Sequence, residues 1–169
     1  MTNRKFLMLF IILSLAGFLT TASADTLKGK GVSSVSKVEI FPVGDVENHN
    51  IGVSTREGMI VFENGEVATA KTVAIWDQVR GGTGWAKGYV HWTFVDGSTI
   101  LNNFHQDVAP AKAEGSVQSD TKVSGEIIKG TGRFEGIKGT MTSSTKVLKT
   151  GKGELGGKNI SEVVFNYSK

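Results

Sequence analysis

Residues 127–140 read Ile-Ile-Lys-Gly-Thr-Gly-Arg-Phe-Glu-Gly-Ile-Lys-Gly-Thr, and this stretch decides the fold class of the chain. Four glycines fall within the ten positions from Gly130 to Gly139. Each glycine costs about 1 kcal/mol relative to alanine inside a helix, so the stretch cannot form a stable helix. The pattern instead predicts a strand, a tight corner built around Phe134, and a second strand.

The glycines are expected to shape this corner. Glycine is needed where the backbone takes a positive φ or approaches another strand closely. Gly132 and Gly136 are expected to flank a turn that pins the Phe134 ring against the rest of the domain. The residues to which we assign a structural role in the corner are Gly130, Gly132, Phe134, Gly136 and Gly139.

After residue 30, apolar residues mostly recur at every second position, and turn residues separate the runs. This pattern is typical of strands. No window carries a sustained apolar stripe at helical spacing, so no helix longer than a turn or two is expected. The chain contains 22 glycines and two prolines, which suits barrel corners. The pattern indicates an antiparallel sandwich or barrel. The predicted strands are residues 34–43, 59–62, 67–76, 85–95, 98–107, 115–118, 122–129, 139–148 and 160–167.

The N-terminus has the pattern of an export signal. Arg4 and Lys5 are followed by an uncharged apolar run over residues 6–19, and Ala22-Ser23-Ala24 matches a signal-peptidase cleavage site. The run is shorter than the roughly 20 residues that span a bilayer. We expect residues 1–24 to be a signal peptide, residues 25–169 to be a single domain, and the mature protein to be periplasmic or secreted, without a membrane anchor.

Charge and cysteine content narrow the class of protein. The chain has 19 Lys+Arg and 16 Asp+Glu, and loss of Arg4 and Lys5 with the signal leaves 17 − 16 = +1. The remaining lysines are scattered, so no nucleic-acid partner is expected. The chain has no cysteine, so an exported domain must be held by its core alone.

Two dipeptides predict hairpins with a defined register. Asn-Gly at 64–65 and Asp-Gly at 96–97 favour two-residue turns. A two-residue turn at 96–97 pairs Trp92 with Leu101 and places Asn103 and His105 on the same face. The turn at 64–65 likewise places Ile60, Phe62, Val67, Val73 and Ile75 on one face.

The hairpin with its turn at 96–97 supplies the candidate ligand site, formed by Trp92, Leu101, Asn103 and His105. The apolar members would bury the body of a small apolar molecule, and Asn103 or His105 would bind its polar end. A wider set of residues could line a barrel mouth: Trp76, Tyr89, Trp92, Phe94, Phe104, Asn103 and His105. The alternative, that these aromatic residues pack the core and His105 lies at a solvated rim, stays open.

Other kinds of site receive little support. The predicted register separates His91 from His105 and Asp107, so no metal site is expected. The Gly-Gly-Thr-Gly stretch at 81–84 lacks the Lys-Ser/Thr and the helix of a phosphate-binding loop, and no cofactor is expected. There is no Gly-x-Ser-x-Gly motif before a helix, and the catalytic residues, if any, stay unknown.

Three segments resemble a known family. Residues 84–97, the corner at 127–140 and the ending at 163–167 are similar to the central hairpin, glycine corner and closing strand of the allene oxide cyclase-like barrels. This superfamily is similar in shape to dirigent proteins, and the similarity covers roughly residues 84–148. It implies an all-β, closed antiparallel barrel of about eight strands with a partial helical extension.

The resemblance also carries functional expectations. Plant members cyclise an unstable fatty-acid epoxide in the barrel cavity and assemble as trimers, which implies a homo-oligomer here. Their catalytic residues lie outside the matched segments, so none is assigned to a position of this chain. The chain also departs from the plant enzymes in its export signal and its lack of cysteine.

Three functions remain open from the sequence. The first is an exported barrel that binds a small apolar or amphipathic molecule, and the second is a cyclase or isomerase acting on such a molecule. The third is an interaction protein with a fully packed core. A sealed interior would favour the third, whereas a cavity with a lone buried polar group would favour the first two.

Overall fold

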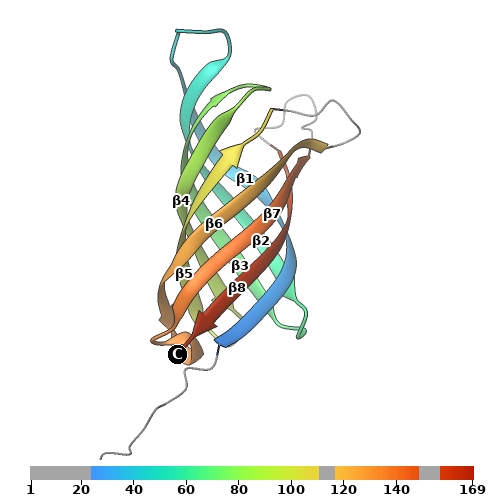
Figure 1. Cartoon of the computed structure of the whole chain (residues 1–169), viewed down its shortest axis with the longest axis vertical. Coiled ribbons are helices and arrows are strands. Elements are labelled where there is room, and N and C mark those ends of the chain that lie inside the picture. Colours follow the sequence, from blue (N-terminus) through green and yellow to red (C-terminus); the bar gives the residue numbers. More distant parts are fainter. Residues whose placement is uncertain (1–23, 111–116, 149–156) are drawn as a thin grey trace, which may run out of the picture.

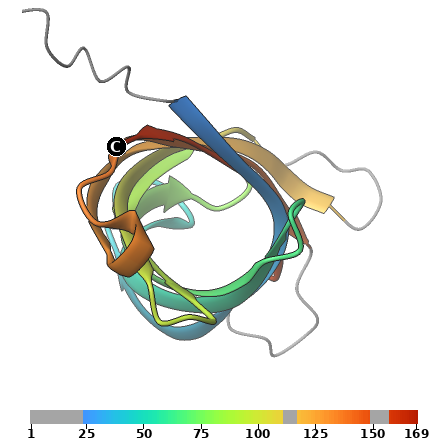
Figure 2. The ribbon, with the colours of Figure 1, turned by 90° about the horizontal axis from the view of Figure 1, so that it is seen from below.

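The computed structural model describes residues 24–110, 117–148 and 157–169. Each strand pairs antiparallel with its neighbour in the chain, and β8 pairs with β1 to close a barrel (Figures 1 and 2). The predicted all-β class and closed antiparallel barrel are confirmed. The elements are β1 Ala24–Pro42, β2 His49–Phe62, β3 Val67–Val79, β4 Gly84–Phe94, β5 Thr99–Val108, β6 Val117–Thr131, the 3-10 helix η1 Gly132–Phe134, β7 Lys138–Leu148 and β8 Asn159–Ser168.

The two ends of the barrel differ. The end drawn lowest in Figure 1, called the lower end below, holds the β2–β3 and β4–β5 turns, η1 and the C-terminus. The upper end holds the β1–β2 and β3–β4 connections. Seen from below, the strands form a ring with η1 at its near edge (Figure 2).

Several predicted boundaries are wrong. Strand β2 begins at His49, ten residues before the predicted strand at 59–62. The described parts of the predicted segments at 115–118 and 122–129 belong to the single strand β6. The predicted signal lies outside the described residues except for Ala24, which begins β1. Within the described segments the one helix is η1, so the implied helical extension is not seen there, and no helix there could cross a membrane.

A tight corner joins β6 to β7. Gly132 and Gly136 have φ of 60° and 80°, and Phe134 between them is only 4% exposed. A Cβ at Gly130 would lie 1.9 Å from the carbonyl oxygen of Phe134, so this position has no room for a side chain. Glu135 is exposed.

Phe134 belongs to an aromatic cluster that fills the lower end. Its ring centroid lies 4.7 Å from that of Phe94 and 6.0 Å from that of Tyr167. Phe94 in turn stacks on Phe62 at 5.5 Å. Since these rings come from β2, β4, η1 and β8, the cluster joins parts of the chain that are far apart in sequence.

Arg133 ties the turns of the lower end together. Its guanidinium lies over the Phe94 and Phe134 rings, at 4.9 and 4.7 Å from their centroids. Its Nη1 also pairs with Glu66 at 2.5 Å and with Asp96 at 3.4 Å. One side chain therefore connects the corner to the β2–β3 and β4–β5 turns.

The predicted registers of both hairpins are wrong by one residue. In the β4–β5 turn the Phe94 N–H donates to Ser98 O and the Gly97 N–H donates to Phe94 O, which leaves three residues in the loop. Gly97 has a φ of 82°, as expected of a type I turn followed by a glycine bulge. The β2–β3 turn is built in the same way, with Gly65 at 86°.

The extra loop residue inverts one strand of each hairpin. Trp92 pairs with Ile100, and Ile60 pairs with Ala68. Because side chains alternate across a strand, Ile100, Asn102 and Phe104 face the interior in place of Leu101, Asn103 and His105. Val67, Val73 and Ile75 likewise face outward, away from Ile60 and Phe62.

We predict that Phe134→Ala lowers the free energy of unfolding by about 3–5 kcal/mol, because it removes a buried ring from a packed cluster. Chemical denaturation measured by circular dichroism tests this. Val95→Ala is the matched control, since Val95 is 88% exposed in the adjacent turn and should change stability by less than about 0.5 kcal/mol. A loss below about 1 kcal/mol for Phe134→Ala would show that the cluster does not hold the lower end.

At the upper end, His49 joins the β1–β2 loop to β3. Its Nδ1 lies 2.6 Å from Asp45 Oδ1 and its Nε2 lies 2.7 Å from Asp77 Oδ1. Both ring nitrogens donate only when the imidazole is protonated. The hydrogen bonds with Asp77 and then Asp45 raise the pKa of His49 above its ordinary value of 6.5.

We predict a pH-dependent part of the stability from this contact. With a raised folded-state pKa, the contribution of His49 is complete below about pH 6.5 and is lost as pH rises through that raised value. As the pH rises from about 6.5 through the raised pKa of His49, the melting temperature should fall less for His49→Gln than for the wild type. His105→Gln, at an exposed histidine near one carboxylate, is the control; equal drops in all three proteins would contradict the role of His49.

Candidate functional site

The four residues predicted to form a ligand site do not share a face. Trp92 is buried inside the barrel, whereas Leu101, Asn103 and His105 lie on the outer side of β5. The cause is the three-residue turn at 95–97, which shifts the register of β5 by one. Of the wider predicted set, Trp76, Trp92 and Phe104 line the interior cavity, Phe94 packs below it, and Tyr89 faces outward.

The outward residues have other surroundings. Asn103 Oδ1 accepts a hydrogen bond of 2.7 Å from the Glu126 N–H, beside the bulge that interrupts the β5–β6 pairing. His105 Nε2 lies 3.1 Å from Asp107 Oδ1 on the exposed surface. Asn103 therefore satisfies a backbone donor of β6, and neither residue reaches the interior.

The interior of the upper half holds a cavity of about 520 Å³. Its floor is apolar and consists of Ile60, Trp92, Met141 and Val163, directly above the aromatic cluster. The walls above the floor mix small apolar residues with hydroxyl and amide side chains. The polar residues that line it are Ser33, Asn50, Ser54, Arg56, Thr72, Gln78, Arg80, Gln106, Ser143, Thr145, Asn159 and Ser161.

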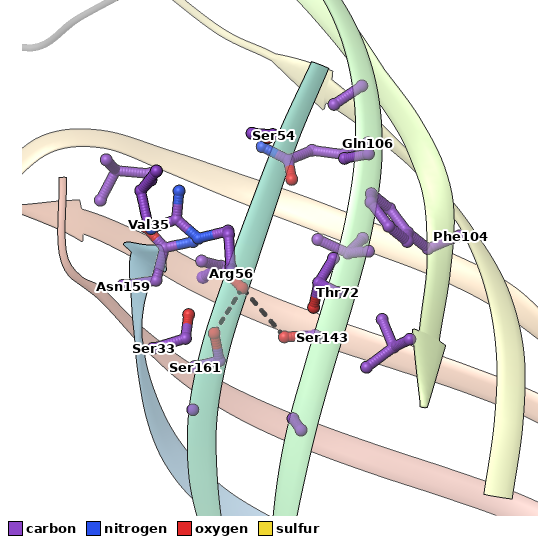
Figure 3. A pocket seen from close by; sticks show the side chains of 18 of the residues that line it. Ser33, Val35, Ser54, Arg56, Thr72, Phe104, Gln106, Ser143, Asn159 and Ser161 are labelled. Atoms are coloured by element: carbon purple, nitrogen blue, oxygen red, sulfur yellow. Dashed lines mark hydrogen bonds between the residues drawn. The ribbon is translucent and has the colours of Figure 1, made fainter. Parts of the chain in front are cut away.

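Arg56 is the central polar side chain of this cavity (Figure 3). It points inward from β2, and its Nη2 donates to the carbonyl oxygen of Gly157, just before β8. Its Nε is fully buried and has no hydrogen-bond partner in residues 24–110, 117–148 and 157–169. Burial lowers the pKa of the guanidinium to about 10, which leaves it charged at neutral pH.

A second polar group beside Arg56 also lacks a partner. Asn159 begins β8 two residues after Gly157, and its buried Oδ1 makes no hydrogen bond within the described part of the chain. Nearby, Thr145 Oγ1 lies 3.0 Å from Ser143 Oγ and 2.9 Å from Ser161 Oγ, forming a short hydroxyl chain (Figure 3). Buried polar groups are normally satisfied, so the two orphaned atoms mark a place where a bound molecule or water belongs.

The cavity has an excess of positive charge. Among its described lining residues, Arg56 and Arg80 are charged, and none is Asp, Glu, Lys or His. Arg80 is exposed, close to the upper end, whereas Arg56 is half-buried inside the barrel. The low polarity around a buried group strengthens its electrostatic interactions, so Arg56 dominates the charge of the interior.

Aromatic side chains form part of the wall. Trp76 of β3 lies against Gly52 of β2, where a Cβ would approach Trp76 Cζ2 to 2.3 Å. Gly52 therefore makes the space in which the indole lies. Trp92 is held at the floor by a 2.7 Å hydrogen bond from its Nε1 to Oδ1 of Asn102, which is fully buried.

The histidines form no metal centre in the described part of the chain. His91, predicted on the face opposite His105, lies on the same outer face. No group of three or more His, Cys, Asp or Glu residues that could hold a metal ion occurs among the described residues.

No protein-family model and no curated protein matches the sequence. Two solved structures of pterocarpan synthase dirigent proteins are similar in structure. GePTS1 has a TM-score of 0.52 at 14% identity, with 92% of this chain and 95% of that chain covered. PsPTS1 has a TM-score of 0.47 at 14% identity, with coverages of 86% and 96%.

At a sequence identity of 14%, the structural similarity to GePTS1 supports the fold alone. The chain has a dirigent-like eight-stranded barrel, and the finer resemblance to allene oxide cyclase-like barrels stays a prediction.

Sequence reasoning missed Arg56, Asn159 and the hydroxyl chain. Arg56 lies in the part of β2 that was not predicted as a strand. One signal was available: Gly52, Ser54, Arg56 and Gly58 alternate with Val53 and other larger residues. That alternation indicates a strand whose small and polar side faces the interior.

Proposed function

We propose that the barrel binds a small apolar or amphipathic molecule in its interior cavity. The observation that carries this proposal is the cavity itself, a volume of about 520 Å³ where a packed core could have been. Pockets for small ligands have volumes of about 300–1,000 Å³ and combine apolar walls with a few polar groups. The apolar floor and the polar side chains around Arg56 have this composition.

The cavity favours the first two functions left open by the sequence over the third, an interaction protein with a packed core. An interaction protein with a filled interior would have large side chains where β2 and β3 carry Ser54, Thr72 and Ala74. The guanidinium, hydroxyl and amide groups of the described lining can donate hydrogen bonds to a ligand. Binding therefore needs no group beyond those present.

A neutral fluorescent probe tests the proposal. N-phenyl-1-naphthylamine should become more fluorescent with the wild type and quench the cavity residues Trp76 and Trp92. Ala74→Phe fills part of the cavity and should weaken binding about tenfold or more, equivalent to about 1.4 kcal/mol. Val73→Phe, the next residue on the outer face of the same strand, should leave binding unchanged.

The outer-face control is needed because the outside of the barrel also carries exposed apolar residues, among them Val53, Val73 and Ile75, to which an apolar probe could bind. Equal binding by the wild type, Ala74→Phe and Val73→Phe would place the probe on that outer face. Such a result, or no binding at all, would contradict the proposed function.

A further inference from the structure

We infer that the ligand of the cavity is an organic carboxylate, with its carboxylate held by Arg56 and its apolar body on the floor formed by Ile60, Trp92, Met141 and Val163. This inference rests on the proposed function and specifies the class of molecule.

The first argument is the position of the guanidinium. Arg56 pairs in register with Val35 of β1, yet its Nη2 reaches past β1 to Gly157 beside β8. The side chain therefore runs along the inside of the wall from β2 toward β8, with its charged end among the residues that line the cavity. An arginine carries five N–H donors in a planar fork that matches a carboxylate, and here Nε–H has no partner among the described residues.

The second argument is charge. A buried charge without a counter-ion is strongly unfavourable. No carboxylate of the described lining faces Arg56, and its one acceptor within the described segments is a neutral carbonyl. A bound anion would supply both the missing charge and the missing acceptor.

The third argument selects a carboxylate among anions. One guanidinium balances one negative charge, and the neighbouring groups are the neutral side chains of Asn159, Ser161 and Thr145. A phosphate dianion would need further cations at this depth, and Arg80 lies at the exposed upper end. The apolar floor below is suited to the body of the same molecule.

A matched pair of ligands tests the inference. Isothermal titration at pH 7.5 would compare 4-phenylbutanoic acid with 4-phenylbutan-1-ol, which have the same body and differ in the head group. The wild type should bind the acid about 10- to 100-fold more tightly than the alcohol, as expected of a hydrogen bond to a charged group. Arg56→Met should remove this preference while keeping the affinity for the alcohol, and Arg80→Met should retain it.

A second variant covers the case in which Arg56→Met does not fold. Asn159→Asp keeps Arg56 and places a carboxylate two residues from Gly157, so it should neutralise the guanidinium and also remove the preference for the acid. Thermal melts would establish that each variant is folded.

The outcomes separate the two proposals. Equal binding of acid and alcohol by the wild type would overturn the inference and leave the proposed function intact. Water would then be the partner of Arg56 Nε and Asn159 Oδ1. An acid preference that survives both Arg56→Met and Asn159→Asp would also overturn it. Binding of neither compound, together with no binding of the neutral probe, would instead count against the proposed function.

Discussion

The packing of Phe134 at the lower end is the interaction on which the rest of the barrel depends. The ring can be buried because Gly132 and Gly136 turn the backbone and Gly130 lets the corner approach its own strand. Phe94 and Tyr167 then meet the ring from β4 and β8. One end of the barrel is thereby closed by contacts between residues far apart in the chain, without a disulfide.

Because the aromatic cluster fills the lower end, the interior of the upper half does not need to be filled by large side chains. The interior of an eight-stranded barrel is wide enough to be filled by side chains or to hold one small ligand. In this chain the inward positions Ser54 and Ala74 are too small to fill it, whereas Val53 and Ile75 on the same strands face outward. The usual apolar-inside pattern is inverted there, and the cavity is the result.

The difference between the filled lower end and the hollow upper half explains which features could be predicted from the sequence. The corner at 127–140 and the barrel class depend on glycines and on apolar alternation, which are local signals. The registers could not be derived from Asn-Gly and Asp-Gly alone, because two-residue and three-residue turns share these residues and differ by the inversion of a whole strand.

The candidate site was missed for a related reason. Arg56 lies in a stretch of β2 whose inward residues are polar or small, so the apolar pattern that marks a strand is absent there. The pairing that brings Arg56 near Asn159 passes through β1. Contacts of this kind depend on barrel closure, which no local pattern encodes.

The chain keeps a charged arginine in its interior with no counter-ion among the residues that the structure describes, although a buried charge without a partner lowers stability. Binding is a sufficient physical reason to retain it, and the account therefore depends on the cavity being occupied. Native mass spectrometry of the protein purified from its own host tests this most directly. The account predicts a mass above that of the chain, with the excess released as a small organic molecule. The mass of the chain alone, under conditions where protein loaded with 4-phenylbutanoate keeps its ligand, would contradict it.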